Sequence, residues 1–221
     1  MVQHRQRTVR RPTIEPTATP LPPGQFLAKR WPVLHQGDVP AFDPASWDFR
    51  IWGLVERDLA LTWPAFSDLP TVESPGDLHC VTRWTKADNI WRGVPAASLL
   101  DLAAPLPTAH FAILHGEAGY TANVPVDALR EEGVLLATHH GGHPLLPEHG
   151  APVRAVLPRL YAWKSVKWMR GIELIQEDRL GFWEEFGYSS SADAWKEERF
   201  ADERGPRPGP SRAAVDEPGD G

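Results

Sequence analysis

Proline is spread along almost the whole chain, with 23 prolines among 221 residues. Proline lacks a backbone N–H, and its ring collides with the preceding helical turn, so this distribution excludes long helices. Trp47, Phe49 and Ile51 alternate with polar Asp48 and Arg50, which is the period of a half-buried strand. Short strands bounded by turn residues follow along the rest of the chain. The sequence therefore predicts an α+β fold that is mainly β, with short helices.

The two ends of the chain differ in composition from the middle. Residues 1–22 are basic and rich in Pro and Thr, and residues 203–221 are rich in Pro, Gly and charged side chains. Such segments bury too little apolar surface to offset the entropy of ordering, so both are predicted to be flexible tails. The folded domain is predicted over residues 24–201, a length that can bury a core without disulfides.

Charge and hydrophobicity exclude several classes of function. The net charge is -6, with Lys+Arg 23 against Asp+Glu 29, so a general nucleic-acid-binding surface is not expected. No stretch approaches the length of apolar residues that spans a membrane. Arg10-Arg11 resembles an export signal, but the residues after it form no apolar segment. We therefore expect a cytoplasmic protein.

Cys80 is the single cysteine, so an internal disulfide is excluded. It lies within Leu78 to Val81, which is predicted to be the end of a buried strand, and Arg83 and Lys86 follow in the next loop. Nearby cations favour a thiolate. Three interpretations remain open: a ligand for a soft metal, a Cys–His nucleophile and an inert core thiol. Because His79 and Cys80 point to opposite faces of an extended segment, they do not form a catalytic pair by themselves.

A cluster of basic residues stands out in an acidic chain: Arg154, Arg159, Lys164, Lys167 and Arg170. Together with the hydroxyl of Ser165, these side chains could hold a phosphate or pyrophosphate. The alternative is the solvated basic face of a strand, which the pattern predicts over residues 166–175 with a break at Gly171.

Four histidines lie close in sequence, which makes a histidine metal centre conceivable: His139, His140, His143 and His149. No second set of ligands accompanies them, so this centre is not favoured. His149 precedes Arg154 closely enough to join the same anion site. Nucleotide-binding and common hydrolase motifs are missing from the sequence.

The order of six segments carries a family resemblance: LHCVTRWT, WRGVP, GYTANVP, HGAPVR, YAWKSVKW and GFWEEFGY. Over roughly residues 24–200 the chain resembles the molybdopterin-binding domain of the sulfite oxidase family. It is most similar to the small bacterial oxidoreductases of that family that lack a haem domain.

The resemblance implies a molybdenum–molybdopterin cofactor whose metal is bound by one protein thiolate. By position, Cys80 is the metal ligand, and His149 and Arg154 contact the cofactor. The cofactor phosphate is expected at the KSVK segment, which comprises Lys164, Ser165, Val166 and Lys167. Tyr188 matches a substrate-pocket tyrosine, and Arg83 and Trp84 are further pocket candidates.

The expected activity is two-electron oxygen-atom transfer on a small-molecule substrate, with a separate electron-transfer partner. Sulfite oxidases carry an Arg-Asn-His segment and an AGNR-type segment, where this chain has RWPVLHQGDVP and VTRW. Sulfite is therefore not expected as the substrate. One alternative is a non-catalytic module of the same fold that binds a phosphorylated ligand or a protein partner. Another is a Cys–His hydrolase or transferase, which requires a histidine within reach of Cys80.

Overall fold

A computed structural model describes residues 20–208 and the backbone of residues 213–214. Most of the two predicted tails lies outside the described residues, namely 1–19, 209–212 and 215–221. The prediction that the tails are flexible stays a prediction.

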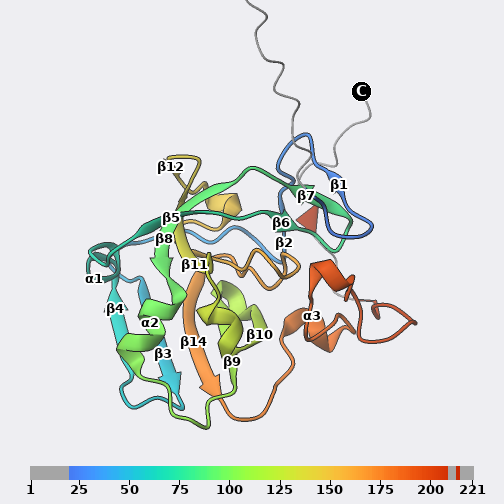
Figure 1. The fold of residues 1–221 in the computed structure, drawn as a ribbon. Helices are drawn as coiled ribbons and strands as arrows, with labels where there is room; N and C mark the ends of the chain where they lie inside the picture. Colours follow the sequence, from blue (N-terminus) through green and yellow to red (C-terminus); the bar gives the residue numbers. More distant parts are fainter. Residues whose placement is uncertain (1–19, 209–212, 215–221) are drawn as a thin grey trace, which may run out of the picture.

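The larger part of the core is built on a five-stranded sheet. Its central strand β14 is parallel to β3 and antiparallel to β9, and the outer pairs are antiparallel. Figure 1 shows these strands side by side in the lower half of the molecule. In spatial order the strands are β10 (Thr121–Pro125), β9 (Phe111–Gly116), β14 (Met169–Ile175), β3 (Asp48–Gly53) and β4 (Leu59–Thr62).

A second, antiparallel sheet packs over the first one. One continuous apolar cluster takes side chains from both sheets, among them Phe49, Leu114, Leu136 and Ile172. The strands of this second sheet are β12 (His143–Pro144), β11 (Leu135–His140), β8 (Ile90–Pro95) and β5 (Val72–Pro75), and β13 (Arg154–Val156) also pairs with β11. The core therefore lies between two β layers.

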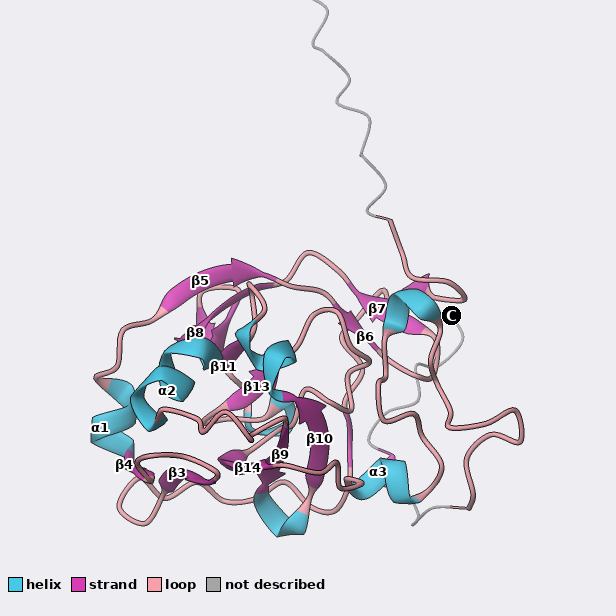
Figure 2. Cartoon of the chain, turned by 60° about the horizontal axis from the view of Figure 1, so that its bottom comes forward, coloured by secondary structure: helices cyan, strands magenta, loops and turns pink. Residues whose placement is uncertain are grey.

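The helices are short. Figures 1 and 2 place α1 (Trp63–Ser67) and α2 (Ala96–Ala103) at one end of the sheets and α3 (Phe182–Glu185) at the other. Single 3-10 turns make up the other helical elements: η1 (Glu117–Gly119), η2 (Val126–Arg130), η3 (Pro147–His149) and η4 (Ala194–Lys196). The predicted mainly β, α+β fold with short helices is confirmed. Within the described residues, no helix has the length and apolar character needed to cross a membrane.

Two small sheets border the pocket described below. In the first, β7 (Trp84–Lys86) lies between β6 (Leu78–His79) and the parallel strand β1 (Phe26–Leu27). In the second, β2 (Leu34–His35) pairs with β15 (Ala213–Ala214). The first of these sheets carries Cys80 immediately after β6.

The strand predicted over residues 166–175 is wrong in part. The strand β14 begins only at Met169, because Trp168 has a left-handed backbone with φ 53°. Gly171 does not break the strand but lies within it, opposite Arg50. A Cβ at Gly171 would lie 2.6 Å from the Arg50 carbonyl oxygen, so the glycine allows a close approach between the strands.

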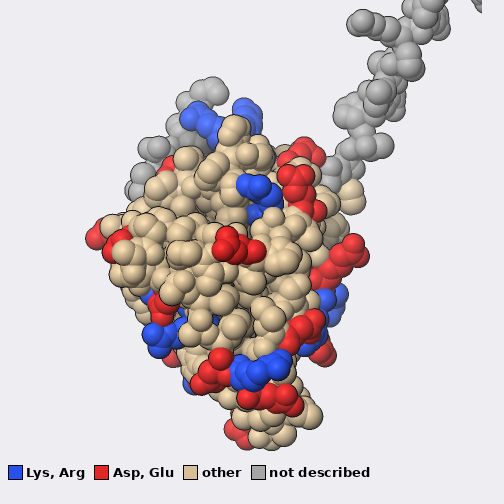
Figure 3. All heavy atoms as spheres, turned by 90° about the vertical axis from the view of Figure 1, so that its left-hand side faces the viewer, with Lys and Arg blue, Asp and Glu red and all other residues tan. Residues whose placement is uncertain are grey.

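Acidic and basic side chains are interspersed on the face shown in Figure 3. That face carries no continuous basic stripe.

Candidate cofactor and active site

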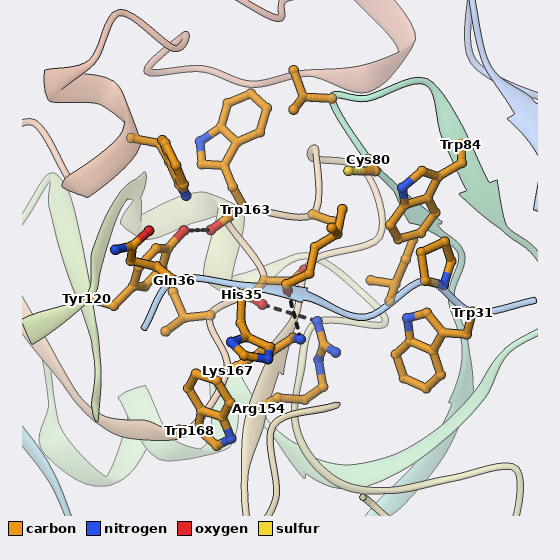
Figure 4. A pocket seen from close by; sticks show the side chains of 18 of the residues that line it. Trp31, His35, Gln36, Cys80, Trp84, Tyr120, Arg154, Trp163, Lys167 and Trp168 are labelled. Carbon is orange, nitrogen blue, oxygen red and sulfur yellow. Dashed lines mark hydrogen bonds between the residues drawn. The ribbon is translucent and has the colours of Figure 1, made fainter. Parts of the chain in front are cut away.

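Cys80 is the first residue of the loop that joins β6 to β7. The loop is tight: Cys80 N donates to Trp84 O over 2.8 Å, and Arg83 N donates to Cys80 O over 3.0 Å. The Cys80 side chain, which is only 9% exposed, lines a pocket (Figure 4). The prediction that Cys80 stands where a strand gives way to a loop is confirmed.

Hydrogen bonds hold both the sulfur and the backbone carbonyl of Cys80. The Thr82 hydroxyl donates to Cys80 Sγ over 3.1 Å, and Gln25 Nε2 donates to Cys80 O over 3.0 Å. The imidazole of His79 instead meets the Thr85 hydroxyl at 2.9 Å. Burial lowers the pKa of His79 to about 4, so its ring is neutral at pH 7. The side chains of His79 and Cys80 therefore lie on different sides of the strand and contact different residues.

The HGAPVR and KSVKW segments lie side by side. Ala155 N donates to Val166 O and Met169 N donates to Val153 O, each over 2.8 Å. Gly150 makes the approach possible, because it has φ +106° and a Cβ there would lie 3.0 Å from the Arg154 Cβ. The tertiary structure thus joins two motifs that the sequence separates.

Arg154 is buried, with 2% of its surface exposed. Within residues 20–208 its guanidinium donates only to carbonyl oxygens: to His149 over 2.9 Å, to Ser165 over 3.2 Å and to Ala155 over 3.4 Å. It also lies over the ring of Trp31, 5.7 Å from the centroid. Burial lowers the pKa of Arg154 to about 10, which still leaves the group cationic at pH 7.

Lys167 brings a second positive charge to the same place. Its Nζ donates to Leu34 O over 2.9 Å and to Glu148 O over 2.6 Å. Burial and the charge of Arg154 lower the pKa of Lys167 to about 7, against the opposing effects of Glu148 and Cys80. The ion pairs found in residues 20–208 include neither Arg154 nor Lys167. Two basic side chains therefore meet at one wall of the pocket without an ion-pair partner in the described residues, and an anionic ligand would favour the charged form of both.

Lys164, the other lysine of the KSVK segment, does not line the pocket. Its side chain is fully buried and pairs with Glu184, with 2.5 Å between Nζ and Oε1. The structure separates the two lysines of this motif: Lys167 faces the pocket, whereas Lys164 faces the interior.

His149 lies behind the pocket wall. Its ring stacks on Trp31 with 3.7 Å between centroids, and its buried Nδ1 has no hydrogen-bond partner in the described part of the chain. Burial, reinforced by the charges of Lys167 and Arg154, lowers the pKa of His149 to about 4. A neutral imidazole with an unused ring nitrogen is thus available at this position.

The other predicted site residues divide between the pocket and the surface. Ser165, Val166 and Tyr188 line the pocket, and Tyr188 packs against Trp163 with 5.3 Å between the ring centroids. Arg83 is solvent-exposed and does not line the pocket, because its backbone is left-handed, with φ 80°, in the tight loop after Cys80. Five tryptophans form much of the pocket wall: Trp31, Trp84, Trp163, Trp168 and Trp183.

His35 and Gln36 also line the pocket, and the sequence did not single them out. His35 Nε2 and Gln36 Oε1 are buried and have no hydrogen-bond partner within residues 20–208. Figure 4 shows both side chains beside Lys167 and Tyr120. Only the departure of RWPVLHQGDVP from the family pattern pointed to this segment.

The pocket fits a cofactor that combines an anionic group with a polar heterocycle. Arg154 and Lys167 supply positive charge, His35 and Gln36 supply unused polar atoms, and Cys80 supplies a soft thiolate donor. The four clustered histidines form no metal centre, since no group of three His, Cys, Asp or Glu side chains in the described residues could hold a metal ion.

The fold and the site together define a domain that binds a redox cofactor, and comparison with known proteins identifies its family. Residues 36–183 match the family described as "Oxidoreductase molybdopterin binding domain". The chain belongs to this family, and its cofactor is molybdenum–molybdopterin. The predicted membership of the sulfite oxidase-type family is confirmed.

Individual relatives agree with this assignment. The chain is 44% identical over 181 residues to the uncharacterized oxidoreductase YuiH of Bacillus subtilis, covering 81% of this chain and 91% of YuiH. It is 26% identical to the nitrate reductase [NADPH] of Beauveria bassiana, but spans only 24% of that protein. It is 29% identical to the rice nitrate reductase [NADH] 1, of which it spans 19%.

A solved structure supports the fold alone. The sulfane dehydrogenase SoxCD of Paracoccus pantotrophus matches with a TM-score of 0.59 and 22% identity, over 65% of this chain and 41% of that chain. The predicted sulfite oxidase-type fold is therefore confirmed.

Proposed function

We propose that this protein catalyses a two-electron oxygen-atom transfer at a molybdenum bound by the thiolate of Cys80. The observation that carries the proposal is that Cys80 opens into the same pocket as two basic side chains, buried Arg154 and half-buried Lys167, which form no ion pair within residues 20–208. A pterin cofactor that bears a phosphate and a thiolate-bound metal requires both features at once. When bound, it would supply a metal centre that cycles between oxidation states two electrons apart.

The basic wall holds the phosphate end of the cofactor in this proposal. Arg154 presents a planar fork and Lys167 a point charge, and the hydroxyl of Ser165 and the backbone at Val166 lie in the same wall. The newly found His35 and Gln36 offer hydrogen bonds to the heterocycle, and His149 supports this wall from behind by stacking on Trp31. Lys164 and Arg83 are not included, because neither side chain lines the pocket.

The opposite part of the pocket favours a neutral organic substrate. Trp84, Trp163 and Tyr188 line it, and Arg154 is the only arginine that lines the pocket within residues 20–208. An oxyanion such as sulfite would need converging cations beside the metal. A sulfoxide or N-oxide instead matches aromatic walls with one polar handle. We propose Tyr188 as the hydrogen-bond donor to the substrate oxygen.

A separate redox protein carries the two electrons in this proposal. The family match accounts for residues 36–183 by a molybdopterin-binding domain alone. Viologen dyes can replace such a partner in an assay, so the reaction can be tested before the partner is identified.

The test is metal and pterin analysis of the full chain made in a host that synthesises molybdopterin. We expect close to one molybdenum and one pterin per chain, and reduction of methyl phenyl sulfoxide with reduced methyl viologen. Cys80→Ala should abolish turnover, while the phosphate contacts should retain much of the pterin.

The outcomes that contradict the proposal are distinct. Folded protein with neither molybdenum nor pterin would refute it. Pterin without reducible molybdenum would favour the non-catalytic module. Undiminished turnover in Cys80→Ala would refute the role of the thiolate as ligand.

A further inference from the structure

The Lys164–Glu184 ion pair is the most deeply buried charged pair in the described residues, with both side chains 0% exposed. Lys164 Nζ also donates to the backbone oxygen and to Oδ1 of Asn123, each over 2.7 Å. An ammonium group has three donors, and these three acceptors use all of them. Lys164 thus has no donor left for a cofactor phosphate.

The same carboxylate also holds a pocket wall. Glu184 Oε1 accepts from the indole nitrogen of Trp163 over 2.8 Å, while Oε2 has no hydrogen-bond partner within residues 20–208. A single oxygen therefore connects the Lys164 ammonium to the Trp163 ring. Lys164 and Trp163 are neighbours in sequence, yet one faces the interior and the other lines the pocket.

Trp163 is held on its other sides by aromatic rings and by its backbone. It stacks on Tyr161 with 5.4 Å between centroids and an interplanar angle of 11°, and it meets Tyr188 edge-on. Its carbonyl oxygen accepts from the Tyr120 hydroxyl over 2.8 Å (Figure 4). The Glu184 contact is the hydrogen bond that fixes the rotation of the indole within this stack.

We infer that Lys164 and Glu184 form a positioning unit that orients the indole of Trp163 and so shapes the substrate side of the pocket. Lys164 holds the Glu184 carboxyl group in the buried site through their ion pair, and the same oxygen accepts from the indole of Trp163. The substrate part of this inference rests on the proposed function, whereas the orientation of Trp163 does not.

Two double variants separate positioning from cofactor binding. Both remove the buried charge pair, so neither leaves an unpaired charge in the interior. The amide double variant, Lys164→Met with Glu184→Gln, retains a side-chain carbonyl that can accept from Trp163. The apolar double variant, Lys164→Met with Glu184→Met, does not. Both are made as full chains in a molybdopterin-producing host, and Trp163→Phe identifies the Trp163 indole signal in the ¹H–¹⁵N spectrum.

We expect wild-type molybdenum and pterin content in both double variants. The Trp163 indole signal should stay near its wild-type position in the amide double variant and should shift or exchange with solvent in the apolar one. In the apolar double variant, KM for methyl phenyl sulfoxide should rise by roughly threefold to tenfold while kcat changes less than about twofold. The amide double variant should recover the wild-type KM.

Two results would overturn the inference. An equal loss of molybdenum and pterin in both double variants would make Lys164 a cofactor ligand after all. An unchanged Trp163 signal in the apolar double variant would show that Glu184 does not hold the indole. The indole signal is read without turnover, so failure of the proposed reaction would leave this test intact.

Discussion

The hydroxyl of Thr82 donates a 3.1 Å hydrogen bond to the sulfur of Cys80. Both residues belong to the loop between β6 and β7, and this loop is closed by the bond from Arg83 N to Cys80 O. A hydrogen bond to a ligating sulfur withdraws electron density from it and raises the potential of the bound metal. If Cys80 binds the metal as proposed, Thr82 would therefore adjust the donor strength of its sulfur.

Replacing Thr82 should shift the molybdenum potential. Thr82→Val keeps the shape of the side chain but loses the donor, so the sulfur donates more strongly and the potential falls. Thr82→Ser is the matched control and should stay close to wild type. Potentiometric titration followed by electron paramagnetic resonance measures the shift. Because Thr82 is exposed, the free energy of unfolding should change by less than about 0.5 kcal/mol in either variant. Equal potentials in the two variants would argue against this role.

Lys167 predicts how the cofactor-free protein responds to alkaline pH. Burial, followed by the charge of Arg154, lowers its pKa from 10.5 to about 7, although Glu148 and Cys80 oppose the shift. Between these two values the unfolded chain binds a proton that the folded chain does not, so stability rises with pH. Lys167→Met should flatten the wild-type rise between about pH 7 and 10 and should also weaken pterin retention.

Chemical denaturation of the cofactor-free chain across this range measures the difference between Lys167→Met and wild type. Subtracting the stability curve of the variant from that of wild type cancels the contributions of the other titrating groups. Parallel curves for the two proteins would show that Lys167 is not the group responsible. In the cofactor-loaded enzyme the bound phosphate would favour the ammonium form of Lys167, so the rise of stability with pH should be smaller.

The lowered pKa of His149 predicts a second pH range, on the acid side, in which stability depends on pH. Burial and the nearby charges of Lys167, Arg154 and His140 lower its pKa from 6.5 to about 4, with Glu148 opposing them. As pH falls from about 6.5 to 4, His149 binds a proton in the unfolded chain but not in the folded chain, so stability is lost. His149→Gln should reduce this loss, but only in part, because His79 has the same depressed pKa. Urea titrations at several pH values test this, and an unchanged acid slope in the variant would contradict it.

The sequence predicted those parts of the site that depend on local pattern. Cys80 follows a strand end that the apolar residues before it indicate, and HGAPVR and KSVKW are contiguous motifs. The mainly β architecture follows from short alternating segments and frequent proline. These features were readable because each depends on residues close together in the chain.

The remaining features depend on long-range contacts. Lys164 and Lys167 look equivalent in sequence. In the structure, however, Lys164 contacts Asn123 and Glu184 in the interior, whereas Lys167 donates to Leu34 O. His35 lies in the two-residue strand β2 and Gln36 directly follows it, and no periodicity could reveal so short a strand beside the pocket. Arg83 points away because a left-handed residue closes the loop. Residue type alone does not determine which way such side chains face.

Gly150 gives the sharpest test of the link between the two motifs. It has φ +106°, and an added Cβ would lie 3.0 Å from the Arg154 Cβ and 3.1 Å from the Lys167 Cβ. Gly150→Ala should therefore strain the backbone and push Arg154 and Lys167 apart. The left-handed conformation alone costs an L-residue roughly 1–2 kcal/mol.

Gly142→Ala is the matched control, since Gly142 has φ +81° but no atom within 4 Å of the added Cβ. Both variants should lose stability through backbone strain, measured as the free energy of unfolding, and Gly150→Ala should lose more because its Cβ also crowds two side chains. Only Gly150→Ala should also lose molybdenum and pterin, because only its Cβ crowds Arg154 and Lys167. Equal cofactor content in the two variants would show that the spacing of these cations does not govern binding. Cofactor loss confined to Gly150→Ala would connect the glycine of HGAPVR directly to the anion site.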